Sequence, residues 1–369
     1  MKIAVFGHDA SDAMLTRRFA AFADLHHEVM GFTMRRGEDA PRPWHNRDLG
    51  RTHDAAFLHR LWAIFRGIQK TGAHDFLKEA DLFWARNLDM LMVALVARAR
   101  AKSDAPVIYE CLDIHHRLLG KGLISQTLRR LERKLLKEVR GIVISSPAFE
   151  AEYFDKMHPD HPRALLLENK LPLRRLPPRP ARKQSCDQHL TLGWVGILRC
   201  QRSLNILMEV AEAMRGGVKV KLHGKPALTA IPHFHDLVEE TENLTYEGPY
   251  QSPDDLDDIY GRLDLIWAGD YYQAGGNSEW LLPNRLYEGG YFGVPALAPA
   301  GTQTAQWITA HGTGHVIEGE PETSLIPFLS TLIAKNELNA LQQKVLSAPT
   351  SVFAEDHSAL DDIIKGVLS

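Results

Sequence analysis

Short apolar segments alternate with stretches of helical periodicity in the first half of the chain. The apolar segments are typical of buried strands, and they are Lys2–Phe6, Val29–Thr33, Leu82–Ala85, Val107–Tyr109, Gly141–Ser145 and Leu165–Glu168. Between the first two, apolar residues recur at steps of three and four, the spacing of one helix face, at Leu15, Phe19, Phe22 and Leu25. Strands that alternate with helices predict a parallel sheet with helices on both faces.

The second half repeats this pattern. Its predicted strands are Leu190–Val195, Val218–Leu222, Leu244–Tyr246, Leu263–Trp267, Val294–Leu297 and His315–Ile317. An intervening helix is marked by Leu204, Leu207, Met208, Ala211 and Met214. Two copies of one pattern predict an α/β protein with two Rossmann-like, doubly wound domains that face each other across a cleft.

The boundary between the two patterns is the segment Lys170–Gln188. After Lys170 it holds four prolines and five basic residues without apolar periodicity, which is typical of an extended linker. We therefore predict an N-terminal domain over residues 1–170, a linker over 171–189 and a C-terminal domain over 190–369, whose last helix can cross back to the first domain. Open parallel sheets bind ligands at the carboxyl ends of their strands.

Composition narrows the class of protein. Hydrophobic residues make up 44% and charged residues 24% of the 369 positions, as in ordinary globular proteins. No apolar run reaches the roughly 18 residues of a membrane span, and the first residues make a poor secretory signal. Cys111, Cys186 and Cys200 are too far apart for a disulfide framework or a metal site. We therefore expect a cytoplasmic protein.

Charge is distributed unevenly, although the net charge is only −3. Residues 1–170 carry +5, residues 171–190 carry +4 and residues 191–369 carry −12. This asymmetry indicates that the first half meets an anionic partner. A membrane surface or a diphosphate-linked acceptor fits better than nucleic acid, for which the chain has no recognised binding motif.

The segment from Leu263 to Pro299 carries the strongest functional signal. It reads as a buried strand, a glycine-containing loop, a helix that begins near Pro283–Asn284 and a second strand. This order places Glu288 within the first two turns of a helix whose amino end faces the loop. A helix amino terminus attracts phosphate, and a carboxylate can accept hydrogen bonds from two vicinal hydroxyls. Phosphate beside a ribose diol predicts a nucleotide.

The loops after the first strand of each half decide between nucleotide-binding classes. Neither Gly7–Asp12 nor Gly196–Arg202 has the three glycines of a dinucleotide site, and no phosphate-binding loop with terminal glycine-lysine-serine is present. A nicotinamide-dependent oxidoreductase is therefore disfavoured. Arg199 and Arg202 instead flank the turn in the second half, and arginine forks bind diphosphate oxygens bidentately. Two solvated surface arginines are the alternative for this pair.

The sequence resembles glycosyltransferases of the GT-B architecture, specifically the family 4 type that builds bacterial exopolysaccharides. The strongest pieces of this resemblance are Gly193–Leu204, Tyr246–Tyr250 and Asn277–Pro295. Weaker pieces are Phe6–Arg18, Ala85–Asp89, Tyr109–Asp113 and Ser145–Tyr153. The resemblance covers the whole chain and implies transfer of a sugar from a nucleotide-diphosphate sugar, with retention of anomeric configuration.

The resemblance also implies roles for particular residues. Glu288 would bind the ribose, Arg199 and Arg202 the diphosphate, and the loop Gly248–Tyr250 would lie against the base. The donor nucleotide would also contact Gly196, Asn284 and Leu286. Asn277 and Glu279 would hold the donor sugar, with Glu279 in the role after a small loop shift; the alternative is that the sugar is held differently. For Asn277 and Asn284, capping of a turn and of the helix is the alternative. Family members often carry a first glutamate eight positions before the second; here Trp280 occupies that position and Glu279 is one residue away.

An acidic run at Ser252–Asp258 imitates the metal-binding aspartates of the other main glycosyltransferase architecture. Serine, proline and then acidic residues also mark the start of a helix, and this structural interpretation is favoured. Pairs such as His158 and His161 lack the pattern of a metal site. We therefore predict that no metal is required and that arginines replace the cation.

The acceptor side is predicted in the first half, where polar residues follow the strands. His8, Asp9 and Arg86 are candidates for contacts with the acceptor, while Asp113 and His115 are candidates to orient or deprotonate its hydroxyl. The predicted catalytic set is completed by Arg199 and Arg202. The acceptor would be lipid-linked or an oligosaccharide.

Two basic amphipathic segments predict a peripheral contact with the inner face of the cytoplasmic membrane. Phe57–Lys70 interleaves aromatic and basic residues, and Lys121–Arg140 sets an apolar stripe of Ile124, Leu128, Leu131 and Leu135 beside six basic residues. Two core helices with solvated outer faces are the alternative. A second hypothesis for the whole protein is a scaffold that binds a sugar nucleotide without catalysis in a polysaccharide assembly complex.

Overall fold

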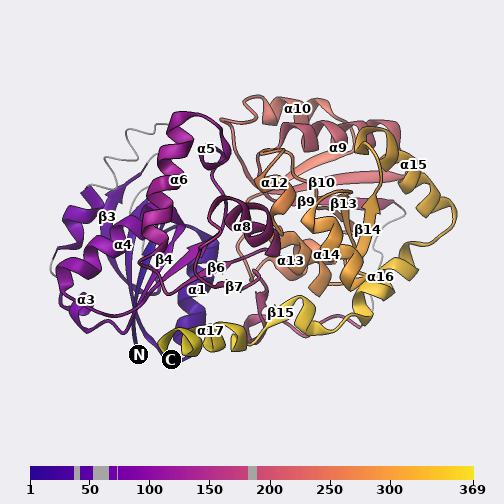
Figure 1. Cartoon of the computed structure of the whole chain (residues 1–369). Helices are drawn as coiled ribbons and strands as arrows, with labels where there is room; N and C mark the ends of the chain where they lie inside the picture. Colours follow the sequence, from indigo (N-terminus) through magenta and orange to yellow (C-terminus); the bar gives the residue numbers. More distant parts are fainter. Residues whose placement is uncertain (37–41, 53–65, 73, 182–188) are drawn as a thin grey trace. The chain divides into compact units, whose positions relative to one another are not determined.

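The structure, a computed structural model, describes residues 1–36, 42–52, 66–72, 74–181 and 189–369. The chain divides into two compact units, drawn from indigo to yellow in Figure 1. Unit 1 comprises Met1–Glu168 and His357–Ser369, and unit 2 comprises Asn169–Asp356. Each unit is a parallel sheet with interspersed helices, so the predicted α/β class with two Rossmann-like domains is confirmed.

Unit 1 contains a seven-stranded sheet in the order β3-β2-β1-β4-β5-β6-β7. Its strands are β1 (Lys2–Gly7), β2 (Glu28–Arg35), β3 (His45–Arg51), β4 (Leu82–Arg86), β5 (Val107–Cys111), β6 (Gly141–Ile144) and β7 (Ala164–Leu166). Its helices are α1 (Ala13–Asp24), α3 (Asp75–Glu79), α4 (Asn87–Ala101), α5 (His116–Leu119), α6 (Leu123–Leu136), α7 (Pro147–Phe149), η1 (Glu150–Phe154), α8 (Asp155–Met157) and α17 (Ser358–Leu368).

Helix α1 shows how the sequence pattern determines the packing of unit 1. The side chain of Asp12 accepts a hydrogen bond from the Met14 amide at 2.9 Å and so caps the helix. Leu15, Phe19 and Phe22 are buried against the sheet as predicted. Leu25, the last residue of the predicted face, is only partly buried because the helix ends at Asp24.

Strand β3 is not anticipated by the apolar pattern. Its sequence, HNRDLGR, has one buried residue, Leu49. Among the described residues it pairs with β2 alone, at the edge of the sheet. Edge strands need little apolar surface, and polar side chains there discourage pairing with other chains. The strand is therefore held by its backbone hydrogen bonds rather than by a hydrophobic face.

Unit 2 contains a six-stranded sheet in the order β11-β10-β9-β12-β13-β14 and a two-stranded pair of β8 and β15. Its strands are β8 (Leu171–Pro172), β9 (Leu190–Leu198), β10 (Val218–Pro226), β11 (Leu244–Gly248), β12 (Leu265–Trp267), β13 (Ala296–Pro299), β14 (Gly314–Ile317) and β15 (Ala354–Glu355). Its helices are η2 (Leu173–Arg175), α9 (Gln201–Ala213), α10 (Phe234–Glu240), α11 (Leu256–Gly261), α12 (Asn277–Trp280), α13 (Asn284–Tyr291), α14 (Gln303–His311), α15 (Pro321–Ala334), α16 (Leu338–Ser347) and η3 (Thr350–Val352).

Alternate residues along the central strands of unit 2 belong to two separate hydrophobic cores. Leu265 and Trp267 pack with the predicted face of α9 and with α15. Ile266 and Ala268 pack on the opposite side with α11, α13 and α14. Because successive side chains of a strand point to opposite faces, helices cover both faces of this sheet, as expected for a doubly wound fold.

The described part of the predicted linker, residues 171–181 and His189, lies in unit 2. Leu171 and Pro172 pair with Ala354 and Glu355, and the Lys170 ammonium donates to the Ser351 carbonyl at 2.8 Å. Prolines have no amide hydrogen to donate. Basic side chains such as that of Lys170 supply hydrogen bonds instead, so the proline-rich segment can still pack. Cys186 lies in the segment 182–188, outside the described residues.

The last helix, α17, packs in unit 1. Leu360, Ile363 and Ile364 join the core formed by β1, β4 and α1, and the yellow helix lies along unit 1 in Figure 1. His357, in the left-handed conformation at the helix start, pairs with Asp24 at 3.3 Å. Within the described residues, no helix has both the length and the apolar character needed to cross a bilayer.

Replacement of Leu360 by alanine should lower the free energy of unfolding by about 2–5 kcal/mol, because its fully buried side chain would leave a cavity in the core of unit 1. Urea denaturation followed by circular dichroism measures this loss. Leu368→Ala, a matched change at a position that is 41% exposed, should have little effect. Equal stability of the Leu360 variant and the unaltered protein would mean that α17 does not belong to this core.

Candidate functional site

Near the carboxyl edge of the sheet in unit 2, strands β9 and β10 pair through two glycines. Gly196, near the end of β9, and Gly224, near the end of β10, have φ values of 127° and 131°. A Cβ atom on Gly224 would lie 1.7 Å from the carbonyl oxygen of Gly196. Only glycine allows this approach, and it sets the direction of the turn that leads to Arg199.

Arg285, in the first turn of α13, connects that helix to the same edge. Its guanidinium donates to the carbonyls of Ala268 at 3.2 Å and Gly269 at 3.0 Å and approaches that of Val195 at 3.5 Å. The side chain is buried, and burial lowers the pKa of Arg285 while the Asp270 carboxylate opposes that shift. Sequence reasoning missed this residue, although its place after Asn284 at a predicted helix start was a usable signal.

The carboxylate of Asp270, in the loop that follows β12, contacts three other residues. One carboxylate oxygen accepts from the Ser278 hydroxyl and the Tyr272 amide, both at 2.8 Å. The other lies 3.5 Å from the Arg199 guanidinium, which also stacks over the Tyr272 ring at 5.0 Å. Arg199 therefore lies at the strand edge as predicted, about one third exposed, with a direction fixed by Asp270 and Tyr272.

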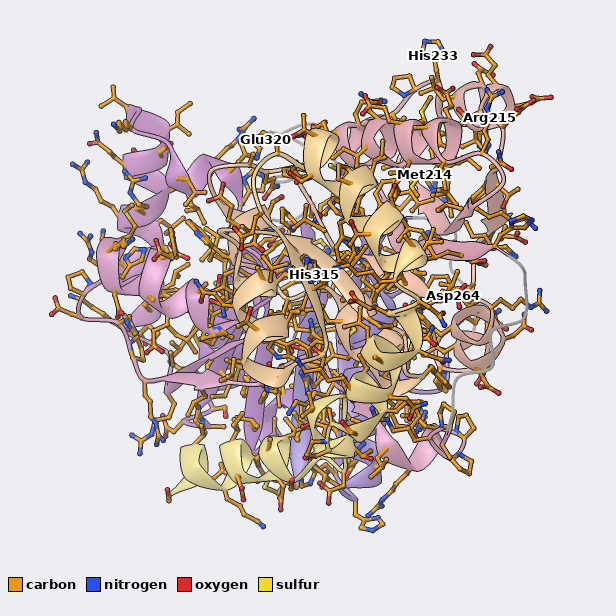
Figure 2. All side chains as sticks on the ribbon, turned by 90° about the vertical axis from the view of Figure 1, so that its right-hand side faces the viewer. Met214, Arg215, His233, Asp264, His315 and Glu320 are labelled. Atoms are coloured by element: carbon orange, nitrogen blue, oxygen red, sulfur yellow. The ribbon has the colours of Figure 1, made fainter. Side chains whose placement is uncertain are left out.

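Arg202 has different partners from Arg199. Its guanidinium donates to both Glu322 oxygens, at 2.7 and 3.0 Å, and to Glu320, and it lies 4.2 Å over the Tyr271 ring. Glu320 stands at the amino end of α15, where Figure 2 labels it. The two arginines predicted to act together thus come from one turn but are each held by their own carboxylates.

Glu288 lies in the second turn of α13 with 1% of its surface exposed. Its Oε2 accepts a hydrogen bond from the Tyr260 hydroxyl at 2.9 Å. Burial, followed by the nearby Glu288 charge, raises the pKa of Tyr260 well above its ordinary value, so the tyrosine remains a donor. A carboxylate fixed on one side in this way keeps a defined orientation.

The remaining residues predicted on the donor side lie in unit 2 with different degrees of burial. Asn277 is buried at the start of α12, and exposed Glu279 accepts from the Gly275 amide at 2.8 Å, which closes the glycine loop. Asn284 is half-buried at the start of α13, while Leu286 is part of the core. At the end of β11, Gly248 has a φ of 93°. Two residues later, the partly buried ring of Tyr250 packs on the same core.

The acidic run at Ser252–Asp258 lies at the start of α11, as the structural interpretation predicted. The helix itself begins at Leu256, so Pro253 precedes it rather than occupying its first turn. Asp257 and Asp258 lie in the first turn, where the helix dipole favours carboxylates, and Asp258 pairs with Arg262 at 2.5 Å.

Unit 1 has its own polar cluster at the carboxyl ends of β4 and β5. Glu110 is buried and accepts from Arg18 at 2.8 Å and from the Trp84 indole at 2.6 Å. The Arg86 guanidinium lies 3.0 Å from the same carboxylate and 3.3 Å from Asp12. Burial raises the pKa of Glu110, but the two arginines and the indole outweigh burial, so the net pKa is lowered. The sequence predicted Arg86 here but gave Glu110 no such role.

The other acceptor-side candidates follow strands β1 and β5. Asp9 is buried and accepts from the Ser11 hydroxyl at 2.8 Å, and His8 lies 3.3 Å from the Asn87 amide. Asp113 is exposed. His115 caps α5 by accepting from the Arg117 amide at 3.2 Å. Its Nδ1 lone pair is therefore occupied, so the neutral imidazole carries its hydrogen on Nε2 and is suited to orient a hydroxyl rather than to deprotonate it.

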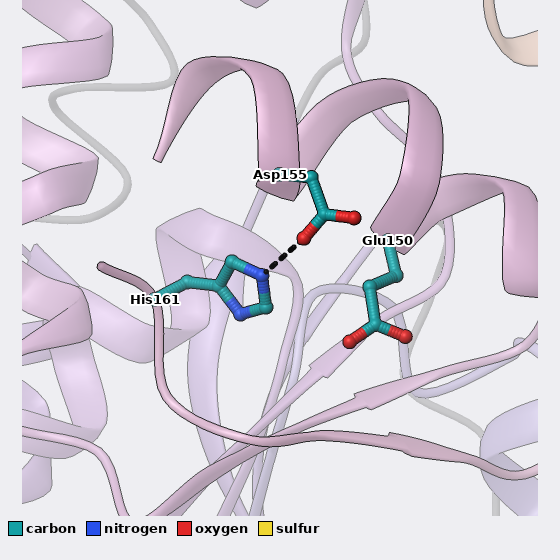
Figure 3. A group of neighbouring side chains, drawn as sticks. All are labelled: Glu150, Asp155 and His161. Carbon is teal, nitrogen blue, oxygen red and sulfur yellow. Dashed lines mark hydrogen bonds and ion pairs between the residues drawn. The ribbon is translucent and has the colours of Figure 1, made fainter. Parts of the chain in front are cut away.

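One group of side chains in unit 1 has the composition of a metal site. Glu150, Asp155 and His161 have donor atoms within 4.8 Å of one another (Figure 3). The imidazole of His161, however, contacts Asp155 at 3.0 Å and the Pro162 carbonyl at 2.6 Å. Both ring nitrogens face oxygen acceptors, whereas a metal ligand needs a lone pair on one of them. Asp155 and His161 form a hydrogen-bonded pair, and the Glu150 carboxylate lies near them.

No protein-family model matches the chain. The solved structures that match the chain over its full length include Anabaena HepE in complex with UDP-glucose, with 15% identity, 99% of that chain covered and a TM-score of 0.69. They also include sucrose-phosphate synthase from Thermosynechococcus elongatus, with 14% identity, 99% of that chain covered and a TM-score of 0.74. These likenesses show the fold, which is the GT-B architecture that the sequence predicted.

A curated relative identifies the family. The succinoglycan biosynthesis protein ExoL of *Rhizobium meliloti* is 38% identical over 293 residues, which span 77% of this chain and 72% of that protein. The chain belongs to the ExoL family. The predicted resemblance to bacterial exopolysaccharide proteins is confirmed.

The lowered pKa of Glu110 predicts an acid sensitivity of unit 1. A carboxylate with a depressed folded-state pKa stabilises the fold above its unfolded-state pKa, and this contribution is lost as pH falls through the folded value. Between about pH 5 and pH 3, Glu110→Gln should therefore lose less unfolding free energy than the unaltered protein. Urea denaturation at several pH values measures this. Glu138→Gln, at an exposed glutamate paired with Arg98, should follow the unaltered protein, and parallel curves for Glu110→Gln would contradict the expectation.

Proposed function

We propose that the chain is a glycosyltransferase that moves a sugar from a nucleotide-diphosphate sugar to a lipid-linked or saccharide acceptor in surface-polysaccharide synthesis. One observation carries the proposal: Glu288 and Arg285 lie on a single helix whose amino end is anchored at the sheet edge beside Arg199. Membership of the ExoL family and the GT-B fold support it.

The donor would bind to unit 2. Its diphosphate would meet the Arg199 guanidinium and the amino end of α13, where the helix dipole favours anions. Its ribose hydroxyls would donate to Glu288, which Tyr260 holds in place. HepE, which shares the fold, has been crystallised with UDP-glucose, and this supports a nucleotide sugar as the donor.

Charge stabilisation would supply most of the catalysis. When the bond between the anomeric carbon and the diphosphate oxygen breaks, the electron pair stays with the diphosphate. Arg199 and the α13 amides would stabilise that charge without reorganisation. Arg202 would add a second cation, but only if the diphosphate competes with Glu320 and Glu322. Arginines in these places support a reaction that requires no metal, and resemblance to family 4 supports retention.

The acceptor would bind to unit 1. His8, Asp9 and Arg86 lie at the strand ends of its sheet, and Asp113 and His115 follow β5. The acceptor hydroxyl would attack the anomeric carbon on the face that the diphosphate leaves, as retention requires. Its proton would pass to Asp113, while the Nε2–H of His115 would donate to the acceptor and orient it. The alternative is a scaffold that binds a sugar nucleotide without transfer; the exposed Glu279, bound to its own loop, leaves room for it.

Glu288→Gln should weaken binding of a nucleoside diphosphate roughly 10- to 100-fold, because hydrogen bonds to a charged acceptor contribute about 1.5–3 kcal/mol. Thermal shift and calorimetry with UDP, GDP, ADP and dTDP measure this; a ligand at 100 times its dissociation constant should stabilise the unaltered protein by about 2.7 kcal/mol. Glu240→Gln, at an exposed glutamate of α10, is the control.

Two results would count against the proposal. Absence of any stabilisation by the four diphosphates would refute donor binding in unit 2. Binding of sugar nucleotides without any release of nucleoside diphosphate, even with an acceptor extract, would favour the scaffold.

We also propose that α6 holds the protein against an anionic membrane. Leu123 is 81% and Ile124 62% exposed, and Arg130, Leu131 and Lys134 are exposed along the same helix. Its buried face is instead Ser125, Glu132 and Leu136, so half of the predicted apolar stripe faces outward. Basic helices with exposed apolar residues lie on anionic bilayers. The second predicted segment, Phe57–Lys70, falls mainly on residues 53–65, outside the described residues.

Arg130→Gln/Lys134→Gln should bind roughly thirtyfold more weakly to phosphatidylglycerol-rich vesicles, because each basic residue near an anionic surface contributes about 1 kcal/mol. Cosedimentation measures the binding, with pure phosphatidylcholine vesicles as the low-charge reference. Lys335→Gln/Lys344→Gln makes the same change of charge on exposed positions of unit 2 and should bind normally. If both double variants bind alike, α6 is not the membrane contact.

A further inference from the structure

Helix α13 is short and poorly suited to hold its own shape. It has eight residues, and two of its last three are Gly289 and Gly290. Isolated helices of this length are unstable in water, and each glycine costs about 1 kcal/mol relative to alanine. Glu288 lies immediately before these glycines, so its position depends on contacts that fix the carboxyl end of the helix.

Arg179, in the segment predicted to be a linker, supplies such contacts. Its Nε donates to the Tyr291 carbonyl at 3.0 Å and its Nη2 to the Gly290 carbonyl at 3.2 Å. The same guanidinium donates to the carbonyls of Val345 at 2.6 Å and Ala348 at 2.5 Å, at the end of α16. One side chain therefore satisfies terminal carbonyls of two helices, where a cation is also favoured by both helix dipoles.

The surroundings of Arg179 hold it in this position. Its guanidinium lies 4.8 Å over the ring of Phe353, and a Cβ atom on Gly290 would lie 2.1 Å from that ring. The glycine that weakens α13 thus permits close contact with Phe353. The Tyr291 hydroxyl also donates to the Pro177 carbonyl at 2.7 Å. Burial lowers the pKa of Arg179, which still leaves an arginine fully charged.

We propose that Arg179 is a positioning residue for the donor site: it fixes the carboxyl end of α13 and thereby the carboxylate of Glu288 two residues before Gly290. This inference rests on the proposed function, since it assumes that Glu288 binds the donor. It assigns the segment 169–181 a role in donor affinity rather than that of a passive connection.

The test measures the affinity of the folded protein for whichever of UDP, GDP, ADP and dTDP binds the unaltered protein most tightly. Arg179→Ala should weaken it roughly tenfold, within the usual range of coupling between sites. Arg179→Lys, which keeps the charge but cannot serve four carbonyls, should fall between. Calorimetry is done far below the unfolding temperature, so that lost stability alone does not change the dissociation constant.

Two controls separate positioning from general destabilisation. Arg174→Ala removes an exposed arginine of the same segment that has no hydrogen bond or ion pair within the described residues. Leu360→Ala destabilises the chain in the core of unit 1. Both should leave the dissociation constant unchanged, while hydrogen exchange at 284–291 should accelerate only in the Arg179 variants.

The outcomes are distinguishable. If no diphosphate binds the unaltered protein, the proposed function fails and the inference fails with it. If a diphosphate binds and Arg179→Ala binds it equally well, or if Leu360→Ala weakens binding as much as Arg179→Ala, the inference alone is overturned.

Discussion

The candidate site of unit 2 depends on guanidinium groups bonded to backbone carbonyls. Arg285 joins the start of α13 to the ends of β9 and β12, and Arg179 joins its end to the end of α16. Carbonyls at strand and helix ends have no partners in their own elements, and a buried one without a partner costs about 1–3 kcal/mol. An arginine with five donors satisfies several at once, and so fixes a helix whose own sequence favours helix only weakly.

The order of strands and helices could be predicted from the sequence because it depends on local patterns. The apolar runs of the sequence predicted every strand of the six-stranded sheet and every strand of the seven-stranded sheet except β3. Strand β3 lies at an edge and needs little apolar surface. The glycine loop and the start of α13 were predicted for the same reason. Glu288, as the acidic residue of that helix, was therefore placed correctly on its element.

The partners of charged residues could not be predicted, because they come from distant parts of the chain. Arg202 pairs with Glu320 and Glu322, more than 100 residues away, and Glu110 with Arg18. No spacing of residues along the sequence predicts such pairs. The same limit explains the predicted linker: prolines and basic residues suggested an extended segment, while the carbonyls that Arg179 binds belong to α13 and α16. A basic residue in a proline-rich segment can be a structural cap as readily as a solvated charge.

The packing of α17 bears on how the protein is made. Unit 1 begins at the first residue, yet Leu360, Ile363 and Ile364 complete its core. During synthesis, its sheet emerges from the ribosome and then waits while Asn169–Asp356 is translated, a delay of roughly 10 to 40 seconds at ordinary rates of elongation. Throughout that interval the apolar side chains that α17 covers are open to water and to chaperones. Of the two units, the one whose translation starts earlier is thus completed later.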